Sequence, residues 1–146
     1  MGKVIKRKDD WVEQLEGFVK KHAQTDFKYG EIDCALYVCD AIEAMTGVDV
    51  AESFRGLYKT KNGALKVLKE YGGLEGIGDF VSRGYGMRDV KANFEGRGDV
   101  VLFVYEGVKS FGFISLSGRE VCGLSESGNT SIPRKKLTII SAWSFA

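Results

Sequence analysis

The segment Asp33-Cys34-Ala35-Leu36-Tyr37-Val38 places a cysteine directly after an aspartate that is well suited to cap a helix. The helix predicted from this start runs from Cys34 to Met45 and ends at Gly47. The free N–H groups and the positive end of the helix dipole favour a thiolate at this position and can hold an oxyanion. Cys34 is therefore a candidate nucleophile. The alternative is a small buried residue, because free cysteines are among the most buried residue types.

Two more helices are predicted around this one. Asp9 or Asp10 can cap a helix whose apolar stripe contains Trp11, Leu15, Phe18 and His22. A third helix starts at Thr60 or Asn62 and ends at the glycines of positions 72 and 73. Glycine then recurs through residues 72–98, a region that allows at most one short helix.

Strand patterns follow in the C-terminal part of the chain. They cover residues 99–105, 110–116, 120–124 and 137–145, with glycine- and serine-containing turns between them. Helices followed by strands indicate a single α+β domain over residues 1–146, with helices packed on an antiparallel sheet of four to five strands.

Composition excludes several classes of partner. The formal net charge of +1 provides no global field for a nucleic acid, so no nucleic-acid partner is predicted. No apolar run approaches the roughly 20 residues of a membrane-spanning helix, which predicts no membrane insertion. The basic residues 1–8 lack the apolar stretch of a secretory signal, so synthesis in the cytoplasm is expected.

The cysteine and histidine content argues against bound metal. Cys34, Cys39 and Cys122 form no C-x-x-C pair, and His22 is the single histidine of the chain. The sequence predicts free thiols, no metal site and no cofactor.

Residues 33–38 resemble the D-C-S-G-F-V nucleophile motif of the NlpC-type papain-like cysteine hydrolases. The segment Arg97-Gly98-Asp99-Val100-Val101-Leu102-Phe103 is similar to the P-G-D-L-V-F-F segment that opens the first strand in that family. The resemblance covers approximately residues 33–124. It implies a papain-like fold, with N-terminal helices packed on the C-terminal sheet.

The resemblance also implies an incomplete catalytic triad. The next strand of the family carries H-V-G-I-Y-L, whereas residues 110–115 read Ser-Phe-Gly-Phe-Ile-Ser, so Ser110 stands at the position of the catalytic histidine. Cys122 stands at the position of the third polar residue, and Cys34 at that of the nucleophile. General acid–base assistance is worth roughly 10²–10⁴-fold in rate. Because His22 is interpreted as a packing residue on its helix, we expect no peptidase activity.

A second resemblance extends further along the chain. Residues 33–36, 40–49, 54–60 and 63–65, together with Ala142-Trp143, are similar to a small uncharacterised domain family of tailed-phage and prophage proteins. This resemblance implies a non-catalytic structural component of a phage tail tip or baseplate, located in the virion and bound to other tail proteins.

Two alternatives stay open at the level of sequence. The first is a cysteine peptidase or amidase that acts on bacterial cell-wall peptides during phage entry, with Cys34 as nucleophile. The second is a ligand-binding domain that holds peptidoglycan fragments in the cleft around Cys34, Ser110 and Cys122.

Overall fold

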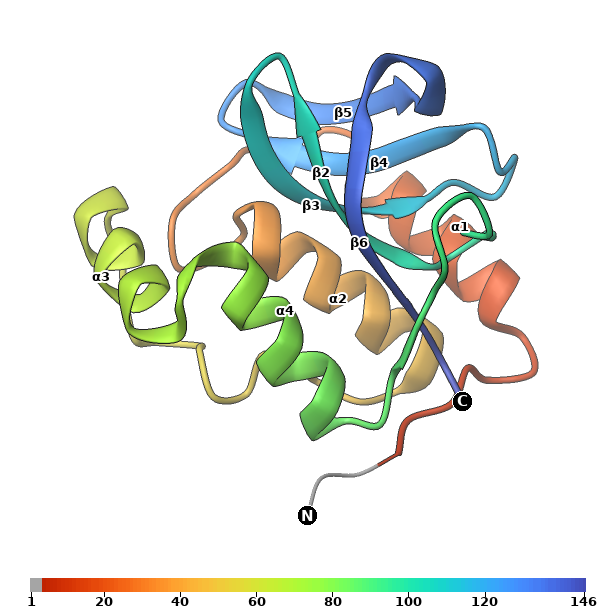
Figure 1. Ribbon diagram of the computed structural model, residues 1–146, viewed down its shortest axis with the longest axis horizontal. Coiled ribbons are helices and arrows are strands. Elements are labelled where there is room, and N and C mark those ends of the chain that lie inside the picture. The colour runs from red at the N-terminus through yellow and green to blue at the C-terminus, as the bar shows by residue number, and fades with distance from the viewer. Residues whose placement is uncertain (1–3) are drawn as a thin grey trace.

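The computed structural model describes residues 4–146, so the first three residues of the basic N-terminal segment lie outside the description. Within this range four α-helices pack against a six-stranded antiparallel sheet, and Figure 1 shows the helices below the sheet. The predicted α+β class is confirmed. None of the helices in residues 4–146 has the length and apolar character needed to cross a lipid bilayer.

Helix α2 (Cys34–Thr46) begins and ends where its capping residues predict. The side chain of Asp33 accepts a hydrogen bond of 3.0 Å from the backbone N–H of Leu36. At the other end Gly47 adopts a φ of +81°, a left-handed conformation that glycine reaches without a steric penalty. Since both signals are local in sequence, this helix is the best-predicted element of the chain.

The other helices are α1 (Trp11–Lys21), α3 (Lys61–Tyr71) and α4 (Gly73–Gly84). Helices α1 and α3 agree with the predicted ones. Helix α4 occupies the first half of the glycine-rich region, where glycine lowers the helix propensity of the sequence. Its conformation is stabilised by packing, because its own residues Gly78, Val81 and Ser82 are buried.

The strands are β1 (Arg88–Asp89), β2 (Val100–Tyr105), β3 (Val108–Ile114), β4 (Glu120–Ser125), β5 (Gly128–Pro133) and β6 (Thr138–Ser144). Their order in the sheet is β1-β6-β2-β3-β4-β5, with every neighbouring pair antiparallel.

Strands β2, β3, β4 and β6 correspond to the four predicted strands, whereas β1 and β5 were not predicted individually. The described sheet therefore has six strands, against the expected four to five. Both additional strands lie at the edges of the sheet. Strand β1 is exposed and β5 is mostly polar, so neither carries the apolar pattern by which a strand is recognised.

The main core lies between the helices and one face of the sheet. Tyr37, Ile42 and Met45 of α2 pack there with Phe113 of β3 and Trp143 of β6. A smaller core covers the other face of the sheet and contains Val101, Phe103, Ile114, Val121 and Ala142. Helix α2 thus lies directly against the strands, with its first turn beside β3.

Candidate functional site

Cys34 is the first residue of α2 and is half-buried where the helix meets the sheet. The side chain of Ser110 and the backbone of Phe111, both in β3, lie close enough to its sulfur to interact with it. The structure therefore brings together the nucleophile position and the histidine position that were inferred from sequence. The group beside the sulfur is a hydroxyl.

The electrostatic environment keeps the Cys34 thiol protonated. Burial is the main cause of its raised pKa, and the negative charge of Asp33 raises it further. Interactions with the Ser110 hydroxyl and with the backbone of Phe111 and Ala35 oppose this rise without cancelling it. The expectation that the helix start favours a thiolate is therefore wrong for this chain, because desolvation of the charged form outweighs the helix dipole.

Asp33 is fully engaged by its neighbours. Its buried carboxylate accepts hydrogen bonds from the N–H groups of Leu36 and Gly30, at 3.0 and 3.2 Å, and from the hydroxyl of Tyr58 at 2.5 Å. These three donors hold the carboxylate as a helix cap. The prediction that Asp33 caps the helix is confirmed by this arrangement.

Cys122 lies on β4, on the sheet face that packs against the helices. Burial raises the pKa of its thiol, while the hydroxyl of Ser131 on the neighbouring strand lowers it. Tyr37, one turn into α2 from Cys34, lies near Cys122, and the pKa of its phenol is raised to about 12 by burial and by that thiol. Cys122 thus faces the second turn of α2.

The strand register separates Cys122 from Cys34 and Ser110. Cys122 is opposite Phe113, three residues beyond Ser110 along β3. The structure brings Cys34 and Ser110 together, and it does not add Cys122 to them.

His22 follows α1 and is occupied by other groups. Its Nδ1 lies 3.0 Å from the Thr25 hydroxyl oxygen, and its ring centroid is 4.5 Å from that of Phe18 and 6.2 Å from that of Tyr37. Burial is the main cause of its lowered pKa, with a smaller contribution from Lys21. The ring is held by aromatic packing, as the sequence analysis expects.

Within the described residues, the charged surroundings of the Cys34 sulfur consist of one carboxylate. Among the groups in residues 4–146 that shift the pKa of Cys34, Asp33 is the one charged side chain, and it is committed to the cap. Transfer of the thiol proton to a neighbouring base is the first step of cysteine-dependent hydrolysis.

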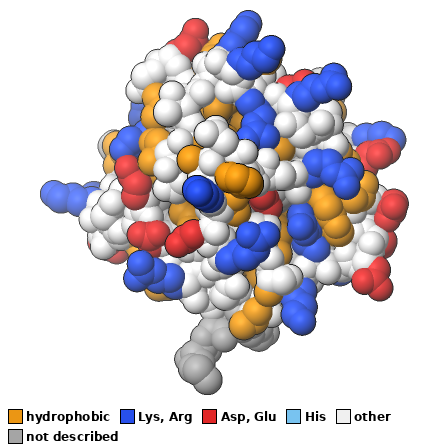
Figure 2. Space-filling view, turned by 45° about the vertical axis from the view of Figure 1, so that its right-hand side comes forward, with side chains coloured by type: hydrophobic (Ala, Val, Ile, Leu, Met, Phe, Trp, Pro, Cys, Tyr) orange, Lys and Arg blue, Asp and Glu red, His pale blue; other side chains and the backbone are white. Residues whose placement is uncertain are grey.

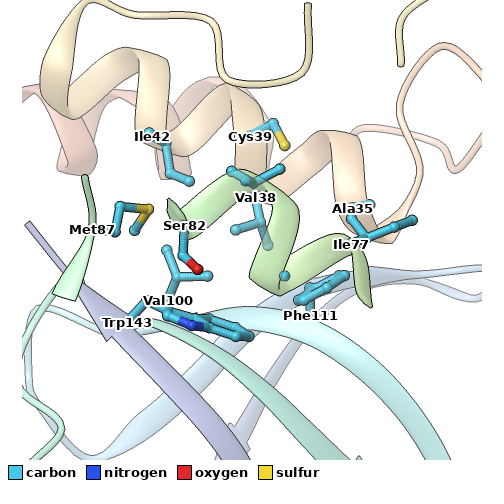
Figure 3. Close-up of a pocket in the computed structure, with 12 residues that line it drawn as sticks. Ala35, Val38, Cys39, Ile42, Ile77, Ser82, Met87, Val100, Phe111 and Trp143 are labelled. Carbon is cyan, nitrogen blue, oxygen red and sulfur yellow. The ribbon is translucent and has the colours of Figure 1, made fainter. Parts of the chain in front are cut away.

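A small apolar cavity lies next to the Cys34–Ser110 pair, between α2, α4 and the sheet (Figure 3). Its volume is about 40 Å³. In Figure 3 Ala35 and Phe111 face it, and these are the chain neighbours of Cys34 and Ser110. The remaining lining residues are Val38, Cys39, Ile42, Ile77, Gly78, Val81, Ser82, Met87, Val100 and Trp143.

The cavity has room for at least one group of the size of a water molecule, since about 10–15 Å³ of such volume is enough to hold one. Cys34, Ser110 and Cys122 are not among the residues that line it. Sequence reasoning missed this cavity because one wall comes from α4, in the region where the sequence carries no clear helical signal. The apolar spacing of Ile77, Phe80 and Val81 was the available signal.

The thiols are free, and no metal site is formed by the described residues. Cys34, Cys39 and Cys122 are all unpaired by disulfides. In residues 4–146 no three His, Cys, Asp or Glu side chains come together as ligands of one metal ion.

No curated protein matches the chain. The family described as "Domain of unknown function (DUF6950)" matches residues 6–145, which is nearly the whole sequence. The chain therefore belongs to the DUF6950 family.

Proposed function

We propose that this chain is a catalytically inactive relative of the NlpC-type papain-like hydrolases that serves as a structural component of a phage tail tip or baseplate. The observation that carries the proposal is the position of the Ser110 hydroxyl near the Cys34 sulfur, in a setting that raises the pKa of the thiol. In an active cysteine hydrolase the corresponding partner is a base.

The papain-like part of the proposal is supported by the position of α2. A cysteine opens this helix, the helix packs on an antiparallel sheet, and the neighbouring strand presents Ser110 to the sulfur. This arrangement follows the order of residues 33–38 and 97–115 that resembles the NlpC-type family.

The absence of catalysis follows from proton transfer. Hydrolysis of an amide by a thiol requires one group that takes the thiol proton and later returns it to the leaving amine. The serine hydroxyl beside Cys34 is too weak a base for the first role. The members of a triad act as a unit, so that the loss of one removes most of the rate enhancement.

The assignment to a phage tail rests on the resemblance to tailed-phage and prophage domains. A domain that has lost its chemistry and keeps its fold acts through its surface, which suits a subunit held by neighbouring tail proteins. Other tail or baseplate proteins are the proposed partners, and the virion is the proposed location.

The test uses virions of a phage whose genome encodes this chain. We expect mass spectrometry of gradient-purified virions to detect the protein in tails that have been separated from heads. We also expect the purified protein to release no peptides from isolated cell walls, both as wild type and as Cys34→Ala. Absence from virions would remove the structural assignment.

The alternative of a cell-wall peptidase or amidase has one favourable observation, the location of Cys34 at a helix start, where the backbone of Ala35 interacts with its sulfur. Cell-wall turnover by the wild type that disappears in Cys34→Ala would establish this alternative. Alkylation of Cys34 by iodoacetamide within seconds at neutral pH would point the same way.

A further inference from the structure

Three arginines converge near the last turn of α2. Arg7 belongs to the N-terminal segment, Arg88 to the edge strand β1, and Arg97 to the turn before β2. Arg7 donates a hydrogen bond of 2.9 Å from Nη1 to the backbone oxygen of Arg97. Arg88 pairs with Ser144 of β6, one residue before Phe145, which Arg7 contacts. Three segments that are distant in sequence thus meet at one place.

Aromatic rings hold the guanidinium groups in position. The Arg7 guanidinium carbon lies 4.1 Å from the ring centroid of Trp11 and 5.3 Å from that of Phe145. The guanidinium carbon of Arg97 lies 5.8 Å from the Trp11 centroid. Stacking on an aromatic face fixes the orientation of a guanidinium while leaving its N–H edge free for a ligand.

The positive charges of this cluster lack ion-pair partners. Six salt bridges occur within residues 4–146, and Arg7, Arg88 and Arg97 take part in none of them. Asp99 is the nearby carboxylate, and it is buried and accepts a hydrogen bond of 2.8 Å from the N–H of Gly96.

The three charges also act on one another. Burial is the main cause of the lowered pKa of Arg7, Asp99 opposes the shift, and the positive charges of Arg88 and Arg97 add to it. Figure 2 shows Lys and Arg side chains across the face that is turned forward there, with Asp and Glu side chains among them. Like charges held together raise the free energy of the folded protein, and a bound anion removes this repulsion.

We infer that Arg7, Arg88 and Arg97 form a binding site for a phosphate group, either a phosphate monoester or a phosphodiester. The planar guanidinium fork matches the oxygens of a phosphate in a bidentate manner. Three cations favour a phosphate over a single carboxylate, because the phosphate offers more oxygens and a larger charge. Exposure of Arg88 and Arg97 leaves the site open to a ligand.

This site is separate from the Cys34–Ser110 pair. Met45, at the far end of α2, lies beside Arg7 around Gly98. With a rise of about 1.5 Å per residue, the backbone positions of Cys34 and Met45 are roughly 16 Å apart. The inference therefore goes beyond the proposed function and does not depend on it.

The test is calorimetric titration of the whole protein with inorganic phosphate at constant ionic strength. The variants Arg88→Gln and Arg97→Gln are compared with Arg119→Gln, which removes one exposed charge in the turn between β3 and β4. We expect each of the first two to weaken phosphate binding about tenfold or more, the effect of losing a hydrogen bond to a charged group. Arg119→Gln is expected to bind as the wild type does.

Two further ligands identify the chemistry. Dimethyl phosphate that binds as tightly as inorganic phosphate assigns the site to a phosphodiester, and much weaker binding of it assigns the site to a monoester. Acetate that binds as tightly as phosphate would overturn the inference. Absence of phosphate binding to the wild type, or equal weakening in Arg119→Gln, would overturn it as well. Circular dichroism of each variant checks that the fold is retained.

Discussion

At the scale of single residues, Ser110 is the side chain whose identity matters most for the reactivity of the Cys34 thiol. Its hydroxyl lies near the Cys34 sulfur, and under the proposed NlpC-type relationship this is the position of the catalytic imidazole. Burial and Asp33 keep the pKa of the thiol above its usual value, and the serine cannot reverse this effect. A histidine in place of Ser110 would therefore put a potential base near this thiol.

We predict that Ser110→His makes Cys34 reactive. An imidazole in contact with the sulfur lowers the pKa of the thiol, and each pKa unit changes the thiolate fraction about tenfold while the thiol is mostly protonated. The measurement is the rate of iodoacetamide alkylation at pH 7, mapped to Cys34 by mass spectrometry. Ser110→Ala is the control and should react as slowly as the wild type. Equal rates in Ser110→His and the control would count against the papain-like geometry.

The buried thiol of Cys39 should make the folded protein less stable as the pH rises above neutral. Burial raises the pKa of its thiol to about 12 in the folded protein, whereas the pKa of a cysteine in an unfolded chain is about 8.5. Between these values the unfolded chain releases a proton that the folded chain retains. The contribution of this thiol to the free energy of unfolding is therefore fully present below the lower pKa and is lost as the pH rises to the higher one. The slope from one such group is at most about 1.4 kcal/mol per pH unit.

Urea unfolding of the wild type and of Cys39→Ala between pH 8 and about 12 measures this contribution. The variant should lose stability less steeply with pH than the wild type, whatever its stability at neutral pH. Tyr37 and other buried acids titrate in both proteins, so the difference between the two slopes isolates Cys39. Parallel slopes would show that the Cys39 thiol ionises alike in both states.

At the scale of the element, α2 is positioned by its cap. Asp33 accepts hydrogen bonds from the first turn of α2, from Gly30 before it and from Tyr58 before α3. One carboxylate therefore connects the start of the helix to two loops, and the same contacts hold Cys34 against β3.

We predict that Asp33→Ala destabilises the protein by about 1–3 kcal/mol, because the variant loses the cap and leaves buried donors without an acceptor. Asp10→Ala is the matched control. Asp10 precedes α1 without a side-chain cap hydrogen bond, so its replacement should stay within about 0.5 kcal/mol. Urea unfolding compares the two, and an equal effect would contradict the role assigned to Asp33.

Helix α4 is held against the sheet through Gly78. A Cβ added at this position would lie 2.8 Å from Cζ2 of Trp143, closer than side-chain carbons normally approach. We predict that Gly78→Ala destabilises the fold by about 1–3 kcal/mol. In α1, Gly17 has open space around it, so Gly17→Ala should stabilise the protein by about 0.5–1 kcal/mol. Thermal unfolding distinguishes the two signs, and a stabilising Gly78→Ala would show that α4 can move away from Trp143.

At the scale of the whole molecule, the proposed site and the arginine cluster lie at opposite ends of α2. The net charge of +1 conceals this arrangement, because Arg7, Arg88 and Arg97 gather at one end of α2 while acidic residues elsewhere in the chain balance the total charge. A molecule organised in this way can bind partners through its surface without using the Cys34 region.

We predict that a phage carrying Cys34→Ala assembles and infects as well as the wild type, because the proposed role needs the fold and not the thiol. Plaque titre and virion composition measure this, with Asp33→Ala as a comparison that perturbs the fold. A titre reduced by Cys34→Ala, with normal amounts of protein in the virion, would assign a chemical role to the sulfur.

Much of this architecture could be predicted because its signals are local. The aspartate before Cys34, the glycine after Thr46 and the spacing of apolar residues act over a few positions, so they determine α2 and the central strands without knowledge of the rest. Edge strand β5 was missed because its alternating residues are polar and half-exposed. Helix α4 was not recognised with clear bounds because its glycines weaken the periodic signal on which such a prediction depends.

By itself, the sequence determined the α+β class and the start of α2, and it supplied the resemblance from which the role of Ser110 is proposed. The tertiary structure decided which side chains meet. The packing of α2 on β3 places Ser110 near the Cys34 sulfur, and burial raises the pKa of the Cys34 thiol. The strand register places Cys122 of β4 opposite Phe113, three residues along β3 from Ser110. The physical reason is that capping and periodicity act between neighbours in the chain, whereas desolvation and side-chain contact depend on how distant segments pack.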